Sequence, residues 1–128
     1  RAAMQNLNVQ EDQARQFILK FGLMPDKLEG KIVQAVDTTL EGFASELLKS
    51  IKFFQTRYTS LPIGNVLLSG YAGTIPGLDQ YIANKTGVQT SVASPWQFVA
   101  TPQNDTNLAS ATAEFAVAVG LAQRSAGL

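Results

Sequence analysis

Apolar residues recur every three or four positions along residues 26–58, with polar residues between them. The apolar positions are Leu28, Ile32, Val36, Leu40, Phe43, Leu47, Ile51, Phe54 and Tyr58. This spacing predicts one long amphipathic helix, because it places all of these side chains on a single helical face. At about 1.5 Å per residue the helix would span on the order of 45 Å. Gly30 and Gly42 disfavour helical backbone, so we expect either glycine to be a point where the helix bends or breaks.

Three shorter segments also carry helical patterns. Residues 9–20 form an amphipathic stretch that is expected to stop at Gly22. Residues 74–87 carry a proline near the expected first turn and a glycine just past the expected end. Residues 111–124 are rich in alanine and glycine, whose small size lets a helix approach a sheet or another helix closely.

Two short segments are typical of strands. Residues 65–70, "NVLLSG", are apolar as in a buried parallel strand, and residues 88–94 alternate in a strand-like pattern. From residue 26 onward the order of helix, strand, helix, strand, helix predicts a parallel pair with a crossover helix. Two strands do not make a stable sheet, so we expect the missing strands from upstream sequence, another chain or a second copy. The start at Arg1 rather than Met points in the same direction, to a fragment or a processed product.

Composition excludes several classes of function for this chain. The chain has 128 residues, a usual size for one domain, and its 10 basic residues equal its 10 acidic ones without clustering. This balance argues against binding to nucleic acid or to an anionic membrane. The chain contains no cysteine and no histidine, which excludes disulfides, thiolate metal sites and histidine-based catalysis. No nucleophile–base pair is visible, so an enzyme with its own active site is disfavoured.

The turn within "LLSGYAGTIPGLDQY", residues 67–81, is the main candidate for a site. Small residues between a strand and a helix let a ligand approach the backbone, and ligands of open α/β sheets bind beyond the carboxyl ends of the strands. The glycines Gly70, Gly73 and Gly77 fit neither a P-loop nor the GxGxxG spacing. The residues alone therefore leave open a ligand-binding loop or a tight connection.

Residues 93–110 form a long predicted loop with two prolines, and loops of this length are often functional. Trp96 and Phe98 in this loop either pack onto the sheet or present an aromatic anchor to a partner.

The run "LLSGYAGTIPGLDQYIANKTGVQTSVASP" resembles the C-terminal part of the type IV pilus assembly ATPase PilM family. The stretch "EDQARQFILKFGL", the long predicted helix and the closing "FAVAVGLAQR" also resemble the family, so the similarity spans residues 8–124. The resemblance implies an α/β chain that forms a partial actin-like (ribonuclease H-like) subdomain, with short parallel strands, crossover helices and an incomplete sheet. Residues 1–25 would end the smaller subdomain, and residues 26–128 would form the C-terminal part of the second large subdomain.

In the actin-like superfamily the glycine turn is the adenosine motif. The resemblance therefore implies that four residues lie against the adenosine of ATP or ADP, namely Gly70, Tyr71, Ala72 and Gly73. Asp12 and Arg15, three apart on one helical face, would contact the adenine and ribose, unless they are an ordinary solvated pair. Ser94 and Pro95 would close the pocket.

This chain departs from the family at Tyr71, which replaces the family's second glycine. Its ring would either stack on adenine or fill the pocket and abolish nucleotide binding. The phosphate hairpins and the carboxylates that hold Mg²⁺ belong to segments outside this chain, so we expect no ATP hydrolysis from the chain alone and at most a weak ATPase in the parent protein.

The resemblance implies a cytoplasmic scaffold protein of type IV pilus assembly, peripheral to the inner membrane. Its partners would be other pilus assembly proteins and the missing half of the actin-like fold or another copy of the chain. The alternative is a protein-interaction module of the same fold that has lost nucleotide binding.

Overall fold

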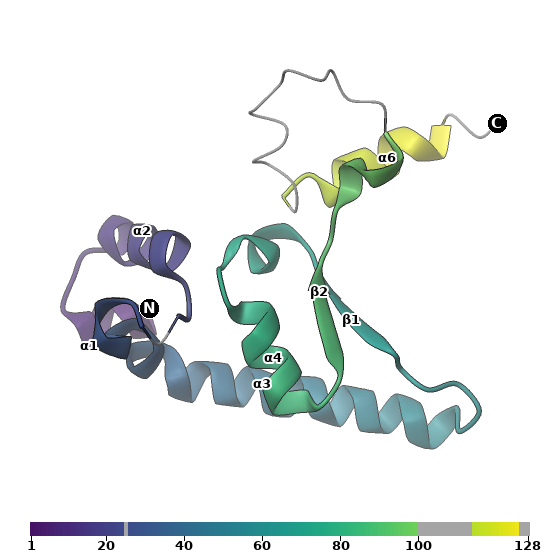
Figure 1. Ribbon diagram of the computed structural model, residues 1–128, viewed down its shortest axis with the longest axis horizontal. Coiled ribbons are helices and arrows are strands. Elements are labelled where there is room, and N and C mark those ends of the chain that lie inside the picture. The colour runs from purple at the N-terminus through teal and green to yellow at the C-terminus, as the bar shows by residue number, and fades with distance from the viewer. Residues whose placement is uncertain (25, 100–113, 126–128) are drawn as a thin grey trace.

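The computed structural model describes residues 1–24, 26–99 and 114–125. Its helices are α1 (Ala2–Leu7), α2 (Glu11–Phe21), α3 (Lys31–Arg57), α4 (Leu78–Thr86) and α6 (Ala116–Ser125), and its strands are β1 (Asn65–Leu68) and β2 (Gln89–Val92). Short 3₁₀ turns lie at Leu28–Gly30, Gly70–Thr74 and Pro95–Phe98. The long helix α3 runs along the base of the molecule, with α1 and α2 near its N-terminal end and the strands along its C-terminal half (Figure 1).

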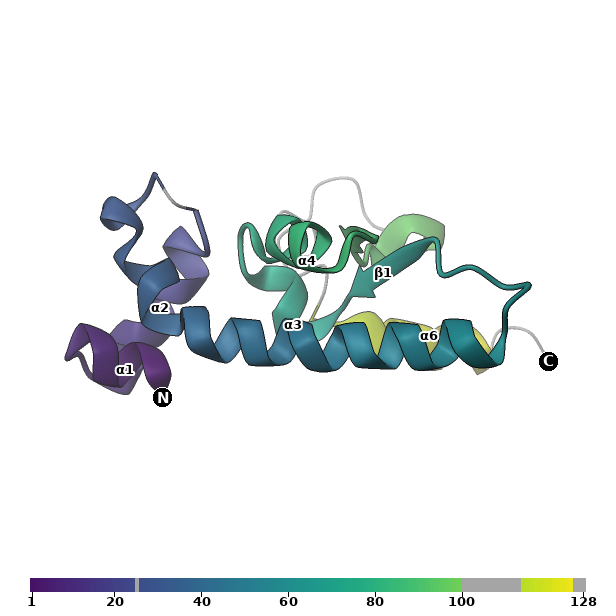
Figure 2. The same ribbon diagram turned by 90° about the horizontal axis from the view of Figure 1, so that it is seen from below.

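The two strands pair in parallel, in register from Asn65 opposite Gln89 to Leu68 opposite Val92. Helix α4 connects them, which confirms the predicted parallel pair with a crossover helix. Leu68 is buried against the helices, whereas its neighbour Leu67 points to the opposite face and remains 62% exposed. The sheet is therefore covered on one face by α3 and α4 and is incomplete, as the sequence predicted (Figure 2).

The buried cluster at the centre consists of Leu23, Leu68, Leu78 and Ile82. These residues come from the end of the α2 segment, from β1 and from α4. The apolar stripe of α3 packs against the cluster, with Val33, Val36, Leu40 and Leu47 on its face. The predicted stripe therefore covers the core at Val36, Leu40 and Leu47, whereas its members Phe43, Phe54 and Tyr58 are 52%, 37% and 45% exposed.

The long helix begins at Lys31, five residues later than the predicted start at 26. Leu28, Glu29 and Gly30 have φ angles of 47°, 55° and 70°, and a run of left-handed residues cannot continue into a right-handed helix. The expected break therefore occurs at Gly30. Gly42 lies inside α3 and does not break it.

The shorter helices mostly follow the prediction. Helix α2 ends before Gly22, and α4 ends before Gly87, which has a φ of 70°. The proline predicted in the first turn of α4 lies outside the helix, because Gly77 caps it and Leu78 is its first residue. Helix α1 has no counterpart in the sequence prediction.

Much of the predicted loop lies outside the described residues, as do residues 111–113 of the last predicted helix and the side chain of Phe98. Trp96 is partly buried, and its ring packs against Phe115 with centroids 6.5 Å apart. Whether Trp96 packs onto the sheet or presents an anchor to a partner stays a prediction. Within the described ranges, no helix is both long and apolar enough to cross a membrane.

An ion pair joins α4 to α3. The Lys85 ammonium donates to the Glu41 carboxylate, with Nζ and Oε1 2.8 Å apart. This hydrogen bond and the charge of Lys85 lower the pKa of Glu41, and the same hydrogen bond raises the pKa of Lys85. The pair stabilises the fold while both groups are charged.

Replacing Ile82 with alanine should lower the free energy of unfolding by about 2–5 kcal/mol, because it opens a cavity at a side chain that is 0% exposed. Urea denaturation measures this change. Asn84→Ala, at an exposed position of the same helix, should stay within about 0.5 kcal/mol of the wild type. An equal effect of both substitutions would contradict the assigned core.

Glu41→Gln should lower the melting temperature at neutral pH and make little difference in acid. The pKa of Glu41 is lowered in the folded protein, so its contribution is present above its ordinary value of 4.5 and is lost as the pH falls through the lowered pKa. Melting curves between about pH 7 and pH 3 measure this convergence. Glu46→Gln removes an ion pair within α3 alone, and a larger effect from it would contradict a tie between α3 and α4.

Candidate functional site

The glycine turn follows β1 directly and forms the 3₁₀ segment Gly70–Thr74. Gly70 has a φ of 61°, and a Cβ built there would meet no atom within 4 Å, so the backbone conformation requires glycine while the space beside it is open. The backbone N–H of Ala93, just after β2, donates to the carbonyl of Leu68 at 2.7 Å. The turn therefore lies beyond the carboxyl end of a parallel pair, where the sequence predicted it.

Helix α2 lies beside this turn and brings Arg15 to Tyr71. The guanidinium carbon of Arg15 is 5.4 Å from the centre of the Tyr71 ring, within the range of a cation–π contact. The two residues line a hollow of about 190 Å³ together with Ile18, Leu19 and Ile75. Two site residues predicted from distant parts of the sequence thus meet in one place.

The other predicted site residues are not part of the lining of this hollow. Asp12 is exposed in the first turn of α2, and Ala72 packs instead against the buried cluster. Gly70 and Gly73 contribute backbone to the turn, outside the lining. Whether these four residues contact a ligand stays a prediction.

Sequence reasoning missed three lining residues, Ile18, Leu19 and Ile75. Ile18 and Leu19 follow Arg15 by three and four positions, so helical spacing alone places them on the face of Arg15. Nothing local marks Ile75, which joins the hollow because the turn folds back toward α2.

The hollow has a defined chemistry. A flat cation and an aromatic ring stand beside three aliphatic side chains, which suits a flat, partly apolar heterocycle better than a phosphate. Complete small-molecule pockets enclose roughly 300–1,000 Å³. The volume of about 190 Å³ is therefore that of a subsite for one part of a ligand.

Ser94 and Pro95 line a different hollow. This second one measures about 440 Å³ and lies between the free face of the sheet, at Leu67 and Ser91, and helix α6. The resemblance implied that Ser94 and Pro95 close the adenosine pocket, but neither residue lines the hollow of Arg15 and Tyr71.

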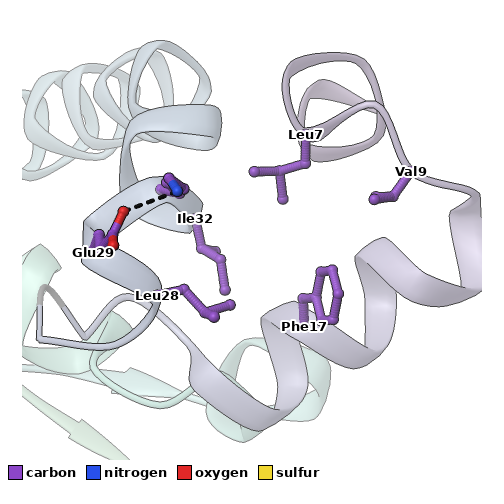
Figure 3. A pocket seen from close by; sticks show the side chains of 7 residues that line it. Leu7, Val9, Phe17, Leu28, Glu29 and Ile32 are labelled. Atoms are coloured by element: carbon purple, nitrogen blue, oxygen red, sulfur yellow. Dashed lines mark ion pairs between the residues drawn. The ribbon is translucent and has the colours of Figure 1, made fainter.

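A third hollow of about 290 Å³ lies between α1, α2 and the start of α3. Figure 3 shows apolar side chains converging on it, those of Leu7, Val9, Phe17, Leu28 and Ile32. The Lys31 ammonium pairs with the exposed Glu29 carboxylate at 2.9 Å and lowers its pKa. These side chains give a packing surface, without a nucleophile and base. Among the described residues, no cluster of three or more metal-ligating side chains occurs.

The sequence matches the family described as type IV pilus assembly protein PilM over residues 3–126. The chain belongs to this PilM family. Among solved structures it is similar to one described as the PilM-PilN type IV pilus biogenesis complex, with a TM-score of 0.76 and 26% sequence identity. That match covers 96% of this chain and 34% of the solved chain. A search of curated proteins finds no match.

The match confirms the predicted family and the predicted fold class. The parallel pair, its crossover helix and the long helix beneath it are part of an actin-like fold. The chain spans about a third of the length of the solved chain that it matches.

Proposed function

We propose that this PilM-family chain supplies the adenosine side of an ATP/ADP cleft in an actin-like scaffold protein of type IV pilus assembly. The observation that carries the proposal is the meeting of Arg15 and Tyr71 over an apolar hollow at the carboxyl end of the parallel strands. Ligands of open α/β sheets bind at this edge.

The residues fit an adenine base. Its flat face would stack on the Tyr71 ring or the Arg15 guanidinium, and Ile18, Leu19 and Ile75 would contact its apolar edge. The backbone at Gly70 is open to approach by the sugar, since no atom lies within 4 Å of its missing Cβ. The exposed Asp12 lies one helical turn from Arg15, where its carboxylate would accept a hydrogen bond from a ribose hydroxyl.

The phosphates and Mg²⁺ need other ligands. The described residues hold no carboxylate cluster for a metal ion, so we assign Mg²⁺ and the phosphates to segments of the fold outside this chain. A nucleotide held in this way would join two parts of the protein and fix their relative angle. Its effect would be conformational, and this chain alone would not be catalytic.

The proposed location is cytoplasmic, at the inner membrane, among other pilus assembly proteins. The similar solved structure is a complex of PilM with PilN, so a PilN-like protein is the proposed partner. The exposed sheet face at Leu67 and the exposed side chains of α6 at Val117 and Leu121 would contact the rest of the actin-like fold or another copy of the chain.

The second candidate is a protein-interaction module without nucleotide binding. Tyr71 favours it, because its ring already occupies the face of Arg15 and is itself 62% exposed. In this case the Arg15–Tyr71 pair is part of a docking surface.

Isothermal titration calorimetry of the full-length protein with ADP and Mg²⁺ tests the first candidate. Arg15→Ala should weaken binding roughly fivefold, the equivalent of about 1 kcal/mol for one cation–π contact. Lys20→Ala is the matched control, because Lys20 on the same helix stands over Phe21 and not over the hollow. The absence of any heat of binding in the wild type would contradict the proposed nucleotide cleft.

Tyr71→Gly separates the two candidates. If the chain is an interaction module, ADP binding should be undetectable in both the wild type and Tyr71→Gly, while binding to a PilN-like partner persists in the wild type. A gain of ADP affinity in Tyr71→Gly would contradict the module and favour a nucleotide cleft that Tyr71 narrows.

A further inference from the structure

The end of α2 touches the turn before α4 with no room for a side chain. Gly22 has a φ of 57°, and a Cβ built on it would lie 2.1 Å from the carbonyl oxygen of Pro76 and 2.7 Å from the Cβ of Pro76. The next residue, Leu23, donates its backbone N–H to the same carbonyl at 2.8 Å. Two backbone segments are therefore in direct contact, and any residue other than glycine at 22 would push them apart.

The contact is anchored on both sides. The Leu23 side chain is buried in the central cluster with Leu68, Leu78 and Ile82. From the opposite segment Gly77 faces the Leu23 backbone, with its missing Cβ 3.5 Å from the Leu23 carbonyl carbon. The end of α2 is thus held on the α/β core by a hydrogen bond and a buried leucine.

The Gly22–Pro76 contact lies at one end of the Arg15–Tyr71 hollow. One wall of the hollow is α2, with Arg15, Ile18 and Leu19, and α2 ends at the residue before Gly22. The other wall is the turn with Tyr71 and Ile75, and Ile75 directly precedes Pro76. The Gly22–Pro76 contact therefore fixes where one wall stands relative to the other.

We propose that Gly22 is a positioning residue that sets the width of the Arg15–Tyr71 hollow. The effect of Gly22 on nucleotide affinity rests on the proposed function, whereas its effect on the distance between α2 and the turn does not. A methyl group at residue 22 must move from 2.1 Å to an ordinary contact of about 3.4 Å or more, so α2 must shift by roughly 1 Å. Helix α1 is held to α3, with Asn6 Nδ2 2.6 Å from the carbonyl of Ala35, so we expect α2 to tilt.

Spin-label distances test the spacing directly. The chain contains no cysteine, so cysteines introduced at the exposed Gln13 on α2 and Gln80 on α4 are its only labelling sites. The wild type should give one narrow distance distribution by pulsed electron resonance. Gly22→Ala should give a longer or broader one.

Gly87→Ala is the matched control. Gly87 also has a positive φ, 70°, but no atom lies within 4 Å of its missing Cβ. This variant carries backbone strain without a clash, so its distance distribution should match the wild type. If Gly22→Ala does not fold, Leu23→Ala keeps the backbone contact and removes the buried anchor, and it should broaden the distribution.

Binding of ADP and binding of inorganic pyrophosphate to Gly22→Ala are then compared. The comparison distinguishes a positioning role of Gly22 from a general loss of structure. Gly22→Ala should weaken ADP binding several-fold and leave pyrophosphate binding unchanged, because only the base-binding part of the cleft moves. If neither Gly22→Ala nor Leu23→Ala alters the distance distribution, the positioning role is wrong even when ADP binds. If the wild type binds no ADP, the proposed function fails, and the distances alone decide the role of Gly22.

Discussion

The burial of Leu23 between β1 and α4 is the contact on which the arrangement of this chain depends. Leu23 follows α2, whereas Leu68, Leu78 and Ile82 belong to the α/β core. Without it, the segment of α1 and α2 would be held to the rest mainly by the contacts of α1 with α3. Burying a leucine side chain contributes about 1.5–3 kcal/mol, enough to favour one docked position strongly.

The candidate site follows from this packing. Arg15 lies two helical turns before Gly22, and Tyr71 lies in the turn that leads to Pro76. When Leu23 enters the core and Gly22 meets Pro76, the side chains of Arg15 and Tyr71 come within cation–π distance. The exposed pair is therefore positioned by buried groups, which is a sounder basis for a binding site than the weak attraction of the pair itself.

The free face of the sheet and helix α6 both carry exposed apolar side chains. A two-stranded sheet with one covered face leaves Leu67 exposed on the other, and α6 presents Val117 and Leu121 to solvent. The solved chain to which this one is similar is roughly three times as long.

Local patterns in the sequence were enough to determine the amphipathic face of α3, the stops at Gly22 and Gly87 and the two strands, because each depends on residues a few positions apart. The ordered motifs were enough for the family, and they placed the turn at the end of β1.

The family resemblance placed Arg15 and Tyr71 in one site, but tertiary structure alone decided the cation–π contact between them, the separation of Ser94 and Pro95 from them, and the contribution of Ile75. Such features arise from contacts between segments tens of residues apart, which no local period records.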